Sequence, residues 1–273
     1  MSRSAAAPSR PSGVRERRRE YPNRVLDRAV AILGAFGPSR PELRLAEFTS
    51  VGLHKSTLYR LLESLRAHRL VELDPETGRY RLGLRLFQLG MLAVERLEVG
   101  RSSESALADL VDRTGETAHI GVLDAGDIVS IARAEGRHAL RLPGAIGRRT
   151  PAYCTGMGKV LLAHLPAETV RDYLARTPLK PFTRRTLTSA ADLQSDLRAA
   201  KQRGYAIDDE EIHPGIRCVA APIRDHTGGV VAAVSAAGPT TRLPREHLPK
   251  VAAEVMRAAA EISRKLGHTS EPA

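Results

Sequence analysis

The sequence contains no tryptophan, and aromatic residues make up only 4% of its 273 positions. Proteins that bind RNA or single-stranded DNA stack bases on aromatic side chains, so this composition disfavours those partners. No stretch approaches the roughly 18 consecutive apolar residues of a transmembrane helix, and the N-terminus lacks the apolar segment of a secretory signal. We therefore expect a cytoplasmic protein that does not contact membranes.

Cysteine is scarce as well, and the two present, Cys154 and Cys218, show no CxxC spacing. In a reducing cytoplasm we expect free thiols. Cys218 with His213 and Asp208, or Cys154 with His164, could form a thiol catalytic set, but spacing along the chain cannot establish that such groups meet in space, and buried inert thiols are the favoured interpretation. We expect no cofactor and no metal, because no HxxxH or CxxC pair accompanies the candidate zinc ligands His119, His138 and His213.

Positive charge is abundant, and the formal net charge is +11. The first 82 residues hold 16 Lys and Arg against 9 Asp and Glu, so most of the excess lies in the first third of the chain. An excess of this size favours polyanions through phosphate contacts and counterion release. Double-stranded DNA is the predicted partner.

The length favours two domains over one. The N-terminus is polar, rich in proline and basic, and cannot contribute to a core. The predicted organisation is a disordered basic arm (1–21), a DNA-binding domain (22–83), a linker helix (84–99), an effector-binding and oligomerisation domain (100–267) and a tail (268–273).

Hydrophobic periodicity predicts three helices in the DNA-binding domain, over 23–36, 43–50 and 54–67, with Asn23 capping the first and Gly52 turning the chain before the third. Leucines recur on one face of the third helix, so its opposite face is polar and suits a recognition helix. The residues predicted to face the major groove are Lys55, Ser56, Thr57, Tyr59 and Arg60.

A β-hairpin is predicted directly after this helix, with strands over 70–73 and 79–82 and a turn over 74–78. A hairpin at this position is a wing, so the N-terminal domain is predicted to be an α-rich winged helix-turn-helix. Arg79 and Arg81 share one side of their strand and can lie along a phosphate backbone. The linker helix is apolar on more than one face, which suits packing within one chain or against a second copy.

Beyond residue 100 the pattern mixes helices with strand hairpins, which predicts an α+β domain with a largely antiparallel sheet. The predicted helices are 103–113, 158–165, 167–176, 189–203 and 246–266. The predicted strands are 117–123, 128–133, 204–207, 217–224 and 230–236.

Several segments resemble the IclR-type transcriptional regulators, in order along the chain. They are 28–33 (RAVAIL), 52–62 (GLHKSTLYRLL), 79–83 (RYRLG), 155–163 (TGMGKVLLA), 204–211 (GYAIDDEE) and 215–222 (GIRCVAAP). The resemblance covers about residues 23–266. It implies a winged-helix domain joined to a GAF-like effector domain, assembly into dimers or dimers of dimers, and binding of a pseudo-palindromic operator and a small carboxylate or aromatic effector.

The resemblance also implies effector contacts at particular positions. Members that bind small oxo-acids carry a hydroxyl at the position of Ala237, so this chain lacks one hydrogen-bond donor and is expected to prefer a larger or less polar ligand. The implied effector-binding residues are Leu142, Thr150, Gly156, Met157, Asp208, Ile216, Cys218, Ser235 and Ala237.

Residue chemistry supports part of this mapping, because Gly156 and Gly158 would let a carboxylate approach the backbone N–H groups at a helix start. Close packing or a tight turn explains two glycines equally well. The favoured function is a ligand-responsive repressor, with an activator of the same family as the alternative. A small-molecule enzyme built on the C-terminal domain, or a dimerisation module with a vestigial pocket, is less favoured.

Overall fold

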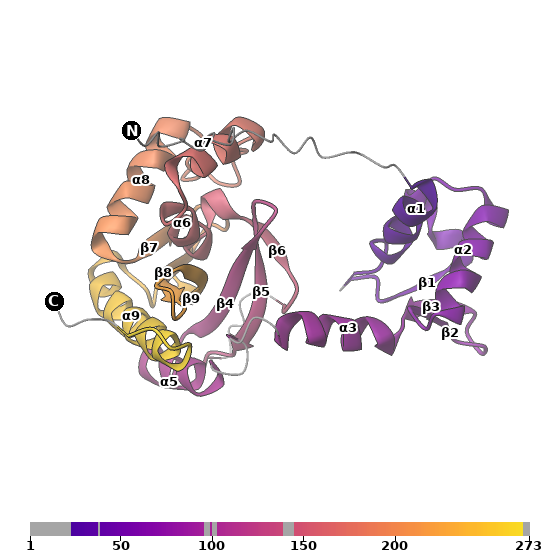
Figure 1. Cartoon of the computed structure of the whole chain (residues 1–273), viewed down its shortest axis with the longest axis horizontal. Helices are drawn as coiled ribbons and strands as arrows, with labels where there is room; N and C mark the ends of the chain where they lie inside the picture. The colour runs from indigo at the N-terminus through magenta and orange to yellow at the C-terminus, as the bar shows by residue number, and fades with distance from the viewer. Residues whose placement is uncertain (1–22, 38, 96–98, 100–102, 139–144, 270–273) are drawn as a thin grey trace, which may run out of the picture. The chain divides into compact units, whose positions relative to one another are not determined.

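The computed structural model describes residues 23–37, 39–95, 99, 103–138 and 145–269 (Figure 1). The chain forms two compact units, residues 1–90 and 91–273. The predicted arm and residues 270–273 of the predicted tail lie outside the described residues, and the domain boundaries drawn from the sequence remain predictions. In the described part of the chain, no helix is long and apolar enough to cross a membrane.

The N-terminal unit is built on two helices, α1 (Arg24–Leu33) and α2 (Lys55–Ala67). Asn23 caps α1 as predicted, because its side-chain oxygen accepts the N–H groups of Val25 and Leu26 at 3.1 and 3.3 Å. The leucine face of α2 packs into a core shared with α1 and the wing. That core contains the buried residues Ile32, Leu43, Phe48, Leu58, Leu62, Leu65, Val71 and Tyr80.

The helix predicted over 43–50 is wrong. The segment instead forms a strand, β1 (Glu42–Arg44), followed by two 3-10 turns, η1 (Leu45–Glu47) and η2 (Thr49–Val51). Leu43 pairs with Tyr80 across the sheet and is buried, so tertiary pairing prevails over the local helical pattern. Gly52 ends η2 with a φ of 63°, which confirms the predicted turn before α2.

The wing is a three-stranded antiparallel sheet in the order β1-β3-β2, rather than a simple hairpin. Strand β2 (Val71–Leu73) and strand β3 (Arg79–Leu82) join at a turn in which the Asp74 carboxylate accepts the N–H groups of Glu76 and Thr77. Helix α3 (Leu84–Glu95) follows directly, as predicted for the linker helix.

The C-terminal unit is an α+β domain around a six-stranded sheet in the order β6-β5-β4-β9-β8-β7, with every described pair of neighbours antiparallel. The predicted fold class is confirmed. The strands are β4 (Thr117–Asp124), β5 (Asp127–Ala134), β6 (Arg149–Pro151), β7 (Ala206–Asp209), β8 (Ile216–Arg224) and β9 (Val230–Pro239).

Helices cover both faces of this sheet (Figure 1). Helices α5 (Glu104–Thr114) and α9 (Leu248–Lys265), the latter entered through the 3-10 turn η4 (Arg245–His247), pack on one face. The other face is covered by the 3-10 turn η3 (Ala152–Cys154) and α6 (Gly156–Ala163), on which α8 (Ala190–Arg203) packs. Helix α7 (Ala167–Arg176) contributes Tyr173 to the same core.

Several details differ from the expected elements of this unit; β7, for example, spans Ala206–Asp209 rather than 204–207. Strand β6 was not predicted, because three residues are too few to show an alternating pattern. Helix α6 begins at Gly156 rather than at residue 158, because Thr155 is its N-cap and its hydroxyl accepts the Gly158 N–H at 3.2 Å.

Candidate DNA-binding surface and ligand cavity

The predicted recognition face lies on the outer side of α2. Lys55, Ser56, Tyr59 and Arg60 are exposed, and Thr57 is half-buried. No side chain caps the first turn of this helix, so a side-chain cap does not occupy its first N–H groups. Tyr59 is 51% exposed although it is large and aromatic, which is unusual for a side chain with no partner surface.

The two wing arginines are already in ion pairs within the N-terminal unit. A guanidinium nitrogen of Arg79 lies 3.6 Å from Glu47, and Arg81 lies 3.0 Å from Glu72. Such solvent-exposed pairs contribute only about 0–1 kcal/mol, so a phosphate can replace the carboxylate at little cost. The wing therefore presents two guanidinium groups that can exchange a carboxylate for a DNA phosphate.

A cavity of about 130 Å³ lies in the C-terminal unit, on the sheet face that α6 covers. Cross-strand pairing explains why residues distant in sequence meet there. His119 pairs with Ser235, and Asp208 pairs with Cys218, which in turn pairs with Ala237. Side chains at paired positions point to the same face of a sheet, so strands β4, β7, β8 and β9 all contribute to the same wall.

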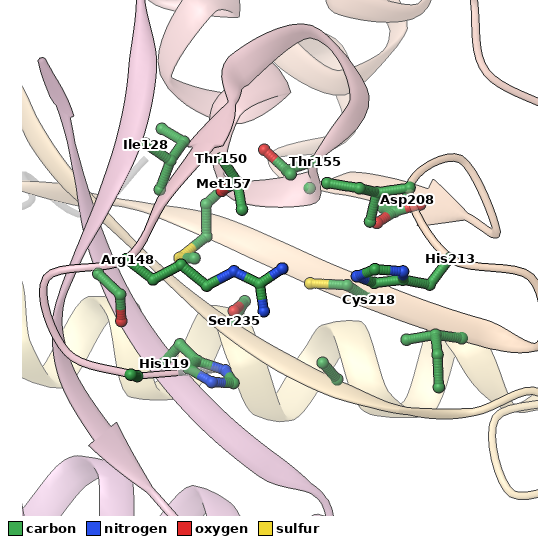
Figure 2. A pocket seen from close by; sticks show the side chains of 16 residues that line it. His119, Ile128, Arg148, Thr150, Thr155, Met157, Asp208, His213, Cys218 and Ser235 are labelled. Carbon is green, nitrogen blue, oxygen red and sulfur yellow. The ribbon is translucent and has the colours of Figure 1, made fainter. Parts of the chain in front are cut away.

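The cavity brings together the described effector residues implied by the family resemblance (Figure 2). Leu142 lies outside the described residues. The remaining residues of that set line the cavity: Thr150, Gly156, Met157, Asp208, Ile216, Cys218, Ser235 and Ala237. Their role in binding a ligand stays a prediction.

The two glycines at the start of α6 differ in their surroundings. A Cβ on Gly158 would lie 2.1 Å from the carbonyl oxygen of Ala152, so Gly158 allows η3 to pack against the helix. Its N–H is used by Thr155, and it does not line the cavity. Gly156 does line the cavity, and a Cβ there would lie 3.3 Å from Cys218 Sγ. The packing explanation therefore holds for Gly158, and the part of α6 that can meet a ligand is its first turn at Gly156 and Met157.

Burial raises the pKa values of both the acid and the thiol of the cavity. Burial raises the pKa of Asp208 to about 7, although its carboxylate accepts the Glu211 N–H at 2.7 Å. Burial and the nearby Asp208 raise the pKa of Cys218 to about 12. Cys218, His213 and Asp208 do line one cavity, but a thiol with this pKa stays protonated and is a poor nucleophile.

The second thiol set does not assemble. Cys154 Sγ lies 3.7 Å from the carbonyl oxygen of Pro151, and His164 Nδ1 lies 2.8 Å from that of Val160. Burial raises the pKa of Cys154 to about 12. Among the described residues, no three histidine, cysteine or carboxylate side chains are grouped as a metal site, and of the candidate zinc ligands His119 and His213 line the cavity whereas His138 does not.

Sequence reasoning missed several cavity residues. Burial and the charge of Arg133 lower the pKa of His119 to about 4, so His119 contributes a neutral imidazole. Arg148 contributes a guanidinium from the turn that precedes β6. The other lining residues that were not assigned to the effector are Ile128, Ser130, Ala145, Thr155, Ile212 and His213.

A buried ion-pair cluster lies beside the cavity wall. Lys159 of α6 is 1% exposed, and its Nζ contacts the carboxylate of Glu211 and lies 2.8 Å from that of Asp196 on α8. Glu211 belongs to the segment that joins β7 to β8, and the same segment supplies Ile212 and His213 to the cavity. Lys159 therefore ties a cavity-lining segment to two helices.

A winged helix with an exposed basic recognition face, and a separate unit with a small-molecule cavity, define a ligand-responsive DNA-binding regulator. The comparisons with known proteins agree with this class. The IclR helix-turn-helix domain matches residues 25–75, and the C-terminal domain of the bacterial transcriptional regulator IclR matches residues 91–264. The chain belongs to the IclR family of bacterial transcriptional regulators.

Full-length relatives match both domains. The HTH-type transcriptional regulator XynR of Escherichia coli K12 is 36% identical over 244 residues, which cover 89% of this chain and 97% of XynR. KdgR of the same organism is 36% identical over 246 residues, covering 90% and 93% of the two chains. The crystal structure of Thermotoga maritima IclR has a TM-score of 0.74 and 31% identity over 90% of this chain and 99% of its own.

Proposed function

We propose that the protein is a repressor that binds a pseudo-palindromic operator as a dimer and releases it when a carboxylate-bearing metabolite occupies the C-terminal cavity. The observation that carries the proposal is the combination, in one chain, of an exposed recognition helix and a cavity lined by the described effector positions. The sign of regulation is supported by the HTH-type transcriptional repressor AllR of Escherichia coli, which is 31% identical over 249 residues. Its place of action is the cytoplasm, where the DNA lies.

In the proposed complex, the N-terminal half of α2 enters the major groove. Arg60 reads a base edge, and Lys55 and Ser56 bind phosphates near the helix start, where N–H groups and the helix dipole favour anions. Tyr59 packs against the DNA, which explains its exposure in the free protein. Arg79 and Arg81 of the wing bind the phosphate backbone and carry no sequence information.

Dimerisation is supported by two exposed apolar surfaces. Helix α1 exposes Val25, Leu26 and Val30, each by about 60%. Helix α3 exposes a second set, which comprises Leu84, Phe87, Leu89, Met91 and Leu92. Apolar surface concentrated on two helices is typical of an association interface, and one recognition helix reads too few bases for a unique genomic site.

The proposed effector is a carboxylate with an apolar body. Met157 and Ile216 provide apolar surface, and Asp208, Cys218 and Ser235 provide polar contacts. Ala237 lies where a hydroxyl would add a donor, so the pocket is proposed to favour ligands larger or less polar than two- or three-carbon oxo-acids. We propose no catalytic activity, because the Cys218 thiol is held protonated.

A gel-shift experiment with DNA from upstream of the protein's own gene tests this function. Replacing Arg60 with alanine is expected to weaken specific binding by about 1–3 kcal/mol. Replacing Arg79 is expected to weaken binding to all sequences alike and to lower the salt dependence. Arg66→Ala is the matched control, because Arg66 lies at the other end of α2 and pairs with Glu63.

Unchanged operator affinity in a folded Arg60→Ala protein would defeat the assignment of the recognition face. A footprint that covers one half-site would defeat the dimer. Adding candidate acids to the wild-type complex separates a regulator from a DNA-binding protein whose cavity has lost its ligand, because only the former releases the operator.

A further inference from the structure

The cavity is lined by one guanidinium group, that of Arg148, among the described residues. The backbone of this residue is held against β5, since Gly147 N–H donates to Ser130 O at 2.7 Å and Ser130 N–H donates to Arg148 O at 3.1 Å. Figure 2 shows the Arg148 side chain directed into the cavity, with its guanidinium between Cys218 and Ser235 in this view. The guanidinium presents a planar fork of N–H donors, which matches the two oxygens of a carboxylate.

The neighbouring Arg149 does not line the cavity, so the inward direction of the side chain is particular to Arg148. Arg149 donates to the Asp124 carboxylate at 2.5 Å and lies 3.3 Å from that of Asp127, outside the cavity. Thr150, the next residue, lines the cavity again. Side chains alternate along an extended strand, so Arg148 and Thr150 point inward while Arg149 points outward.

Two buried hydroxyls face the same space without a satisfactory partner. Ser130 Oγ and Ser235 Oγ are buried, line the cavity and have no hydrogen-bond partner among the described residues. Ser235 is 1% exposed, and the thiol of Cys218 beside it is at most a weak partner. A buried polar group without a partner is costly, so these hydroxyls indicate a ligand that accepts or donates hydrogen bonds.

The first turn of α6 alone offers little to an anion. The Gly158 N–H is committed to Thr155, and the Gly156 N–H faces the sulfur of Cys218. The carboxylate therefore needs a further partner, and Arg148 lines the same cavity with its side chain directed into it (Figure 2).

We propose that Arg148 is the principal partner of the effector's carboxylate, which lies between its guanidinium and the first turn of α6 and accepts a hydrogen bond from Ser235. Asp208 and His213 lie on the β7 side of the cavity and suit a hydroxyl or similar polar group of the ligand. The ligand class is thus a monocarboxylate with an apolar body and a second polar group. This inference rests on the proposed function and deepens it.

Calorimetric titration of the full-length protein tests the assignment, with 4-hydroxybenzoate and 6-hydroxyhexanoate as probes and 4-hydroxybenzamide and 6-hydroxyhexanamide as their uncharged counterparts. A charge-assisted pair contributes enough that Arg148→Met is expected to weaken binding of the preferred acid by about tenfold or more. Arg148→Lys is expected to recover part of that loss. Arg149→Met removes the same charge one residue away, outside the cavity, and is expected to bind as the wild type does.

The outcomes are separable. The role of Arg148 is overturned if Arg148→Met binds the acid as tightly as the wild type does. It is also overturned if the wild type binds an acid and its uncharged counterpart equally well. Both results leave the proposed effector site intact. If neither acid binds the wild type, the proposed ligand class is overturned as well. An equal loss in Arg149→Met would show a general charge effect and would also overturn the assignment.

Discussion

The buried cluster around Lys159 offers a prediction whose magnitude follows from the structure. Lys159→Met keeps the aliphatic length of the side chain and removes its charge. Burial lowers the pKa of Lys159, but the Glu211 and Asp196 carboxylates raise it by more, so the lysine is charged at neutral pH. The substitution therefore leaves Glu211 buried without a counter-charge.

The cost is dominated by Glu211. Its side chain is 5% exposed, whereas that of Asp196 is 25% exposed and can recover part of its hydration. Burial already raises the pKa of Glu211 and Lys159 opposes this, so removing the lysine raises the pKa further. Removing one partner of a buried ion pair typically costs about 3–5 kcal/mol. For a unit of this size, that corresponds to a fall in Tm of about 6–20 °C.

Thermal and urea unfolding of the full-length protein, followed by far-ultraviolet circular dichroism, measures this loss. Lys159→Met combined with Glu211→Gln is expected to be more stable than Lys159→Met alone, because the second change removes the uncompensated charge. Lys265→Met is the control, since Lys265 forms an exposed pair with Glu261, and its loss is expected to cost less than about 1 kcal/mol. A Lys159→Met protein within that same margin of the wild type would refute the reasoning.

Two further predictions concern residues near the same wall. Burial raises the pKa of Asp208 to about 7, and Glu211 and Lys159 lie close to it, so the folded state retains a proton that the unfolded state loses above about pH 4. The free energy of unfolding is therefore expected to fall by about 1.4 kcal/mol per pH unit up to about pH 7, relative to that of the Asp208→Asn protein. Parallel pH profiles of the two proteins would contradict this. Gly158→Ala is expected to destabilise the protein by about 1–3 kcal/mol or more, because the new Cβ would lie 2.1 Å from the carbonyl oxygen of Ala152. Gly156→Ala is the matched control, because the nearest contacts of its Cβ would be at 3.3 Å. Equal unfolding midpoints of the two variants would count against the packing argument.

The fold was largely predictable because its elements carry strong local signals. Ser189 caps α8 and Gly204 ends it with a φ of 82°, and both ends were expected from residue type alone. The strand β1 at residues 42–44 was not, because it pairs with β3, which follows more than thirty residues later. No local sequence pattern predicts a strand of three residues whose partner strand is that distant in the sequence.

The candidate site was predictable only in part, and for a different reason. Periodicity and spacing do not reveal which residues share a cavity, and Asp208, Cys218 and Ser235 were singled out by resemblance to a family. His119 was considered only as a zinc ligand, and its position opposite Ser235 follows from strand register, which the sequence does not show. Arg148 precedes a strand too short to recognise.

The alternation of side chains along a strand is the signal from which the unpredicted cavity residues could have been identified. Four strands or strand edges contribute cavity residues as pairs two positions apart: Ile128 with Ser130, Arg148 with Thr150, Ile216 with Cys218, and Ser235 with Ala237. The family resemblance supplied both members of the last two pairs and only Thr150 of the second. Because side chains alternate along a strand, a known cavity residue marks its neighbours two positions away as candidates. Applied to Thr150, this rule selects Arg148 and rejects Arg149, which the structure places in ion pairs with Asp124 and Asp127.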